Sequence, residues 1–342
     1  MSSTSLPSSG VAPGDPTEGP AHRSLGKALL VRIATERQLL LIVLILVLIA
    51  GMTILEPTTF TRPANAAVVL LDTAQTGILA CGMMLLMISG MFDLSIGGIL
   101  AFSGIMAGLA AKNFGFPPVA AFLVGCGWGV FLGAINGTLV TKFRINALIA
   151  TLATLSIYRG GLQLVSGAGV TNIGNDFTIF GQTRILGIYS PFWFMAVIVL
   201  LFGFLVGRTR YFRQAYYIGG NPSAAKLSGI NVDRTVFSFF VIMGLLAGLA
   251  GALLASRLNT AVVLAGQGVE LKVITAVVLG GASLSGGVGT IFGAFLGVLF
   301  MALLQNAMII AGISPFWQLI VVGVVLLTSV GLDQFARRGN RA

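Results

Sequence analysis

Long apolar runs with few charges recur from residue 38 almost to the C-terminus, and they constrain the fold more than any other feature of the sequence. Of the 342 residues, 56% are hydrophobic and only 9% are charged, whereas soluble domains carry about a quarter charged residues. A helix of about 20 apolar residues crosses the hydrocarbon core of a bilayer. Barrel strands would instead alternate in segments of about ten residues. The sequence therefore predicts an all-α polytopic membrane protein.

The apolar runs divide the chain into about ten predicted transmembrane spans with a tail at each end. The first 22 residues are rich in Ser, Pro and Gly, which predicts a disordered tail over residues 1–37. Residues 38–332 would form the transmembrane domain, and residues 333–342 a basic tail. The predicted spans are 38–55, 64–89, 96–112, 117–140, 146–166, 189–207, 235–256, 270–285, 289–310 and 315–332.

Most of the 20 Lys and Arg residues fall on one side of these predicted spans. Because loops rich in Lys and Arg stay in the cytoplasm, both termini and residues 207–234 are expected on the cytoplasmic side. The net charge of +10 does not indicate a nucleic-acid partner, since the basic residues lie in loops between spans and serve orientation in the lipid bilayer.

Residues 207–234 form a basic, polar segment between two apolar runs. Asn221 suits an N-cap and Pro222 suits the first helical position. Residues 223–228 can form one or two turns, and Gly229 can supply a left-handed end. A short rigid helix on the cytoplasmic side predicts a surface on which a partner protein pushes.

The glycine-rich residues 280–290 do not form a phosphate-binding loop, because no Lys followed by Ser or Thr comes after the glycines. If this protein uses ATP, another chain binds it. No metal site is expected either: the single histidine is His22, and Cys81 and Cys126 lie in apolar runs without ligand spacing. A secondary carrier or channel working alone is the alternative, although the spans offer little of the ionisable relay that ion coupling needs.

Polar residues inside the spans are candidates for a substrate pathway. Thr151, Thr154 and Tyr158 fall on one face of the fifth span, beside Arg159, and could line a path for a hydroxylated substrate or bond between helices. Asn306 is a weaker candidate of the same kind. Asp93, with Ser95, stands at a helix junction, where it can cap the helix starting near residue 96 or take part in gating.

Glycines recur every fourth residue at 125–137 in the fourth span and at 289–297 in the ninth. Such ladders let another backbone approach closely, as a static contact or a mobile one. The two ladders correspond if the chain is an internal repeat of five plus five spans. The similarity of residues 93–98 (DLSIGG) to 283–287 (SLSGG) breaks that register, and indicates reuse of turn chemistry.

Four motifs, in order within residues 40–335, resemble the ribose-type sugar permeases, the membrane subunits of bacterial ATP-binding-cassette importers. The motifs are residues 93–97 (DLSIG), 148–160 (LIATLATLSIYRG), 218–230 (IGGNPSAAKLSGI) and 276–287 (AVVLGGASLSGG). The resemblance implies a ten-helix permease of the vitamin-B12-importer type in the bacterial inner membrane. It also implies import of a monosaccharide or related polyol by a chain that is not itself an enzyme.

The same resemblance implies the partners and the contact site. Two permease copies pair around one path, a cassette ATPase that holds ATP and Mg sits below, and a periplasmic sugar-binding protein delivers the substrate. This chain would bind no cofactor. The helix at 221–229 would be the helix that couples to the ATPase. Its contact residues would be Asn221, Pro222, Ala224, Ala225, Lys226, Leu227 and Gly229.

Overall fold

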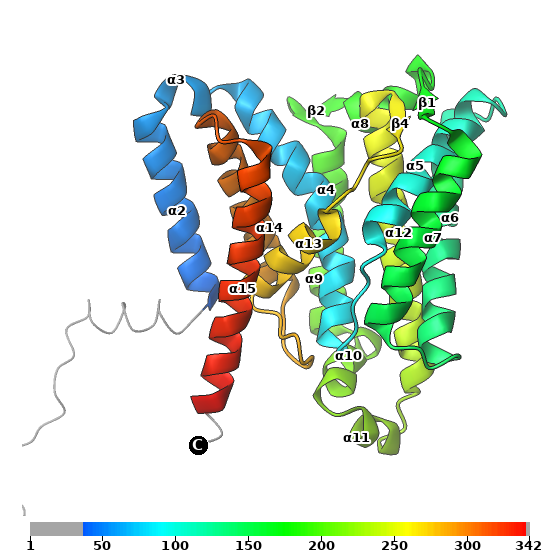
Figure 1. The fold of residues 1–342 in the computed structure, drawn as a ribbon, viewed down its shortest axis with the longest axis vertical. Helices are drawn as coiled ribbons and strands as arrows, with labels where there is room; N and C mark the ends of the chain where they lie inside the picture. Colours follow the sequence, from blue (N-terminus) through cyan, green and yellow to red (C-terminus); the bar gives the residue numbers. More distant parts are fainter. Residues whose placement is uncertain (1–36, 340–342) are drawn as a thin grey trace, which may run out of the picture.

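The computed structural model describes residues 37–339, and the protein is an all-α membrane protein with a helix at each predicted span (Figure 1). The predicted N-terminal tail before residue 37 and the last three residues of the predicted C-terminal tail, 340–342, lie outside the described residues. Within the described part, seven helices are long and apolar enough to cross a membrane. The ten helices are α2 (Arg37–Leu55), α4 (Pro63–Ile88), α5 (Ile96–Lys112), α6 (Pro118–Thr141), α7 (Ala147–Ser166), α9 (Ser190–Arg208), α12 (Val232–Leu258), α13 (Val269–Leu279), α14 (Ile291–Ile310) and α15 (Pro315–Gly339).

Short elements cover the two ends of the bundle. One end carries α10 (Arg210–Gly220) and α11 (Pro222–Leu227), and we call it the α11 end. The opposite end carries α3 (Pro57–Phe60), the 3-10 helix η1 (Asn175–Thr178) and α8 (Ile179–Gln182). It also carries two small antiparallel sheets, β1 (Gly169–Thr171) with β4 (Thr260–Val262) and β2 (Arg184–Ile185) with β3 (Ile188–Tyr189). The start of α2 and the end of α15 both lie toward the α11 end (Figure 1).

The predicted span at 270–285 is wrong, because α13 is a half-helix of 11 residues. At the usual rise it is about 16 Å long, roughly half the hydrocarbon thickness. Gly281, Gly286 and Gly287 adopt positive φ angles of 99°, 83° and 77°, a conformation that ends a helix and that other residues rarely adopt. Figure 1 shows α13 about halfway along the bundle, joined to α14 by the non-helical residues 280–290.

A second non-helical segment, residues 89–95, connects α4 to α5. Gly90 has φ 77°, so the chain turns sharply after α4 and re-enters the bundle before α5 begins at Ile96. α5 is therefore only 17 residues long. Each of the two segments 89–95 and 280–290 brings non-helical backbone next to the bundle core.

The two halves of the bundle exchange their central helices, in agreement with the predicted five-plus-five repeat. α12 packs against α5 and α6, whereas α4 packs against α13 and α14. α4 and α12 also contact each other at the centre. In this repeat α5 corresponds to α13. Segment 89–95 comes before α5 in the chain, whereas segment 280–290 comes after α13. The similar motifs at 93–98 and 283–287 therefore do not occupy equivalent positions in the repeat, as the sequence indicates.

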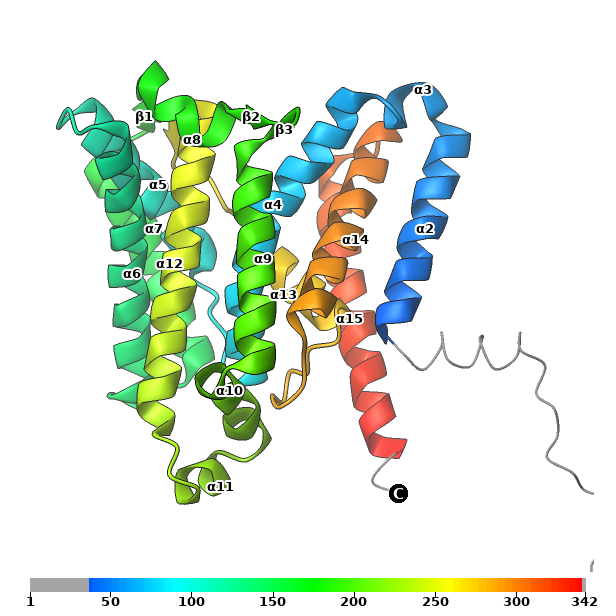
Figure 2. The same cartoon turned by 180° about the vertical axis from the view of Figure 1, so that it is seen from behind.

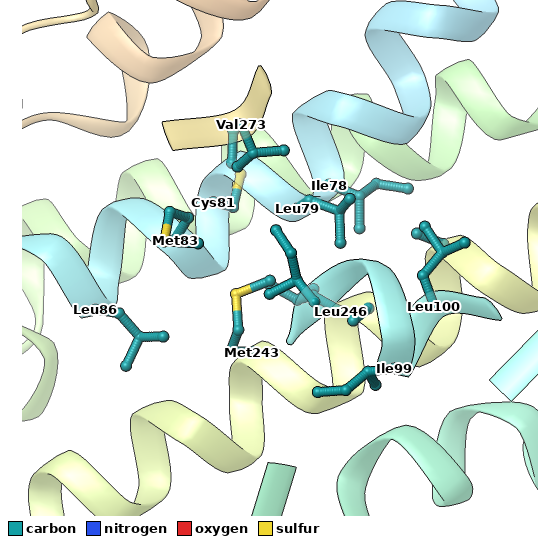
Figure 3. Packing of buried hydrophobic residues seen from close by; sticks show 14 of the residues in the cluster. Ile78, Leu79, Cys81, Met83, Leu86, Ile99, Leu100, Met243, Leu246 and Val273 are labelled. Atoms are coloured by element: carbon teal, nitrogen blue, oxygen red, sulfur yellow. The ribbon is translucent and has the colours of Figure 1, made fainter. Parts of the chain in front are cut away.

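The core lies where α4, α5, α12 and α13 meet. Residues 76–88 of α4 are all buried, and Met243 and Leu246 of α12 face them across the contact (Figure 3). Ile99 and Leu100 of α5 and Val273 of α13 complete the cluster (Figure 3). Because lipid tails are as apolar as these side chains, close packing rather than burial from water holds the helices together.

The glycine ladder of α6 is a close backbone contact with α12. A methyl group added to Gly133 would lie 2.5 Å from the Phe240 carbonyl oxygen and 2.9 Å from the Gly244 Cα atom. The ladder of α14 faces α13 instead, where Gly297 meets the Ala276 carbonyl. The two ladders are thus both packing surfaces, but their partner helices are not equivalent in the repeat.

Gly133→Ala should destabilise the protein by about 1–3 kcal/mol, because the added methyl group forces α6 away from α12. Gly127→Ala is the matched control, since Gly127 lies on the exposed face of the same helix with nothing within 4 Å of an added methyl group. Thermal unfolding of the detergent-purified protein measures both. Equal midpoints for the two variants would show that the α6–α12 contact is not closely packed.

Candidate functional site

The candidate site is the arm formed by α10 and α11, which projects beyond the ends of the long helices (Figures 1 and 2). α10 lies against the bundle through Ala215 and Ile218, both 0% exposed. The Thr235 hydroxyl donates to Gln214 Oε1 at 2.9 Å, which ties α10 to the first turn of α12. The arm is therefore fixed to the bundle rather than tethered by a flexible loop.

α11 begins and ends as its sequence predicts. The Asn221 side chain accepts a hydrogen bond from the Ala224 N–H at 3.0 Å, and Pro222 is the first helical residue. Gly229 has φ 83° and its N–H donates to the Lys226 carbonyl at 3.1 Å. These hydrogen bonds give partners to free backbone groups at both ends of α11. They therefore hold the helix as a rigid unit, although it has only six residues.

Only part of α11 is available to a partner. The Leu227 side chain is 91% exposed, and Ala224 and Lys226 are also exposed. Ala225 is 4% exposed and faces the rest of the chain. The expectation that Ala225 offers its side chain to a partner is therefore corrected, because one turn of helix points Ala225 inward and Leu227 outward.

A cavity of about 470 Å³ opens beside α11. Arg144, in the turn between α6 and α7, forms two hydrogen bonds of 2.8 Å with the Asp233 carboxylate at the start of α12. This ion pair joins the wall of the cavity to the α6–α7 turn. The lining residues are Arg144, Pro222, Ser223, Lys226, Gly229, Ile230, Asn231, Val232 and Asp233.

The last turn of α10 lies between the two non-helical segments. A methyl group added to Gly286 would lie 2.9 Å from the Gly219 Cα atom and 3.0 Å from the Gly90 Cα atom. The Gly287 N–H donates to the Ile88 carbonyl at 2.8 Å. We call this contact of Gly90, Gly219, Gly286 and Gly287 the glycine junction. Through it, α10 contacts segment 280–290 and the start of segment 89–95 directly.

A second contact joins α10 to segment 280–290. The Tyr216 hydroxyl donates to the Gly289 carbonyl at 2.8 Å. Because Tyr216 stands one turn before Gly219, α10 holds segment 280–290 at two points of the same helix face.

Asp93 lies beyond the glycine junction and is fully buried. Its Oδ1 atom accepts from the Ser95 N–H at 2.8 Å and from the Ser95 hydroxyl at 2.6 Å. Asn136 Nδ2, on α6, donates to Ser95 Oγ at 2.7 Å and to Asp93 Oδ2 at 3.2 Å. The Tyr158 hydroxyl, on α7, lies 3.0 Å from Asn136 Oδ1. This Asp93 network therefore links the entry of α5 to two other helices.

Comparison with known proteins identifies the class of molecule that this arm belongs to. The family described as "Branched-chain amino acid transport system / permease component" matches residues 65–330. The chain belongs to this permease family. No solved structure matches it.

Three characterised relatives of this permease show how far the similarity extends. The ribose import permease protein RbsC of Bacillus subtilis is 42% identical over 292 residues, covering 84% of this chain and 90% of the relative. RbsC of Escherichia coli K12 is 37% identical over 297 residues, covering 85% and 92%. The L-arabinose ABC transporter permease protein AraH of Azospirillum brasilense is 36% identical over 307 residues, covering 88% and 89%.

The predicted pathway residues of the permease are brought into the protein interior rather than into one open path. Thr151 and Thr154 are buried, and their hydroxyls donate to carbonyls of their own helix at 2.8 Å and 3.3 Å. Tyr158 belongs to the Asp93 network. Asn306 pairs with Asn65 of α4 through amide hydrogen bonds of 2.7 Å and 3.1 Å. In the permease chain by itself, these four side chains bond between or within helices.

Arg159 holds the segment that leads from β4 to α13. Its Nη1 atom donates to the carbonyls of Val263 at 2.9 Å and Ala265 at 2.8 Å. Glu270 lies close enough to interact with the Arg159 charge, and both side chains approach Gly97 in the first turn of α5. Arg159 therefore lies at the entries of both α5 and α13.

Two contacts of the permease are absent from the sequence-based predictions above. Lys272 of α13 pairs with Asp72 of α4, with its Nζ atom 2.7 Å from both carboxylate oxygens. Asn136 is the central member of the Asp93 network. Opposite charges within apolar runs usually pair, so the presence of Asp72 and Lys272 in two spans was the available signal for that contact.

Gly219→Ala should break the glycine junction, because the added methyl group would overlap the Ile88 carbonyl and approach Gly287 N to 2.5 Å. We expect transport by the permease, reconstituted in liposomes with its ATPase and binding protein, to fall about tenfold or more, because the overlap costs about 1–3 kcal/mol at this contact. Gly220→Ala is the control, because nothing lies within 4 Å of its added methyl group. Transport by Gly219→Ala at the rate of Gly220→Ala would refute the role of the junction.

Proposed function

We propose that this permease is the membrane subunit of an ATP-driven importer for a monosaccharide in the bacterial inner membrane. Its relatives are named for ribose and L-arabinose, which favours a pentose. The family description names branched-chain amino acids instead, but relatives matched over more than four-fifths of this chain carry more weight for the substrate class. The observation that carries the proposal is the capped α11 helix, joined through α10 to both non-helical segments of the bundle.

The proposal places α11 in the cytoplasm. Arg208, Arg210, Arg213 and Lys226 lie at the α11 end, where the rule for basic loops predicts the cytoplasm. In this orientation the sheets β1–β4 and β2–β3 face the periplasm. Both chain termini are then cytoplasmic.

Three protein partners follow from this function. A cassette ATPase seats α11 and holds ATP and Mg, so the permease itself binds neither and performs no catalysis. A periplasmic binding protein delivers the sugar to the opposite end. A second permease copy completes the translocation path.

The energy of ATP binding would reach the membrane core through three contacts in series. Closure of the ATPase displaces Leu227 and Lys226 at the surface of α11. α10 moves with α11 because a single residue, Asn221, separates the two helices. The glycine junction then shifts segments 89–95 and 280–290, and with them the entries of α5 and α14. Sugar affinity changes only because the two conformations bind it differently.

Leu227→Ala combined with Lys226→Glu should uncouple this system, since it removes the exposed apolar contact and reverses the adjacent charge. We expect sugar-stimulated ATP hydrolysis to fall about tenfold or more in liposomes that contain permease, ATPase and binding protein. Leu200→Ala is the control, because Leu200 is 74% exposed in the middle of α9, away from both ends of the bundle.

Undiminished ATP hydrolysis and transport in the double variant would reject α11 as the coupling contact. Gradient-driven uptake by the purified permease in liposomes without any ATPase would reject the importer proposal itself and favour a carrier that works alone.

A further inference from the structure

The α6–α7 turn, residues 142–146, lies at the same end of the bundle as α11 (Figure 1). The Ile145 N–H donates to the Leu139 carbonyl at 3.1 Å, which closes the turn on the last part of α6. Within the turn Arg144 has φ 59°, a left-handed conformation that Gly adopts readily and that residues with long side chains rarely adopt. Gly would serve this turn without steric cost, so the Arg144 side chain must have a use outside the turn itself.

The Arg144 side chain reaches Asp233 at the start of α12 and forms part of the wall of the cavity of about 470 Å³ beside α11. Both side chains of this ion pair are open to solvent, with exposed fractions of 68% and 44%. An ion pair so exposed adds little to the stability of a fold. Its more specific effect is to place a cation on the cavity wall, which Lys226 of α11 also lines.

The cavity and its surroundings carry an excess of positive charge. Arg144 and Lys226 line the cavity, and its one carboxylate, Asp233, is already paired. Within residues 38–331, Asp233 is also the only solvent-accessible carboxylate at the α11 end. Further cations at that end are Lys142, Arg208, Arg210, Arg213 and Arg234. A cavity with this charge balance attracts an acidic group.

We propose that an acidic segment of the cassette ATPase enters this cavity and contacts α11 and the α6–α7 turn together. The inference rests on the proposed function, because it takes the ATPase as the partner that seats α11. The cavity opens beside α11, so a partner held by the exposed Leu227 side chain lies next to its mouth. Lys226 and Arg144 then attract a carboxylate of that partner into the cavity.

This second contact gives the ATPase a route into the first half of the bundle that does not pass through α10. Asn146 accepts a hydrogen bond from the Leu148 N–H at 2.9 Å and so begins α7 directly after the turn. α7 carries Tyr158, whose hydroxyl belongs to the Asp93 network. The ATPase would therefore act on segment 280–290 through α10, and on the Asp93 network through α7.

The test measures the dissociation constant of the complex between the purified ATPase subunit and the permease in phosphatidylcholine nanodiscs. Arg144→Gly removes the cation and suits the left-handed turn, and we expect it to weaken binding about tenfold. Lys142→Ala is the matched control, because Lys142 is an exposed cation of the same turn that does not line the cavity, and its binding should not change. Asp233→Asn removes the one carboxylate of the cavity and should tighten binding about threefold.

The proposal is overturned if Arg144→Gly binds the ATPase as tightly as Lys142→Ala does. It is also overturned if Asp233→Asn weakens binding as much as Arg144→Gly, because the ion pair would then only hold the turn in place. A loss confined to nanodiscs that contain phosphatidylglycerol would assign the cavity to an anionic lipid headgroup instead. If Leu227→Ala with Lys226→Glu loses the ATPase while Arg144→Gly keeps it, the proposed function stands and only the cavity contact is wrong.

Discussion

Within a bilayer every backbone N–H and C=O group must find a partner inside the protein, and this constraint governs the two places where the chain leaves the helix. Segments 89–95 and 280–290 satisfy part of this requirement through the end of α4, through their own backbone and through side chains. Gly287 donates to the Ile88 carbonyl, and Ser283 donates through its N–H to the Val288 carbonyl at 3.1 Å. The Asp93 carboxylate accepts a hydrogen bond from the Ser95 N–H. Both segments also lie against the same helix, α10, through Gly219 and Tyr216.

These contacts make α10 the connection between the surface and the core. Gly219 is in contact with both segments because only a residue without a side chain lets three backbones meet at this distance. Tyr216 adds a hydrogen bond to segment 280–290 one turn away. In the proposed function, α11 would transmit force applied at its exposed face, because both of its ends are capped. The segment that carries Asp93 and the glycine-rich segment thus contact the same helix, although they lie in different halves of the repeat.

The sequence predicted the helices of the bundle well, because each long apolar run has one stable solution in a bilayer. It also predicted the caps of α11, since Asn221, Pro222 and Gly229 act locally. It failed at α13, where the apolar run continues past Leu279 and hydropathy does not register the positive φ angles of Gly281 and Gly286. It failed at Ala225 because a helix of six residues has too few turns for a periodic pattern to reveal its buried side.

Contacts between residues far apart in sequence were the least predictable part of the site. Lys272 and Asp72 are separated by 200 positions, and Asn65 and Asn306 by 241. A charge or amide inside an apolar run indicates that a partner exists, but composition does not indicate which helix supplies it. The exchange of α4 and α12 between the two halves decides those partners. Because α4 packs against α13 and α14, its Asp72 and Asn65 bond to the second half of the chain, and the two halves are joined by polar contacts as well as by close packing.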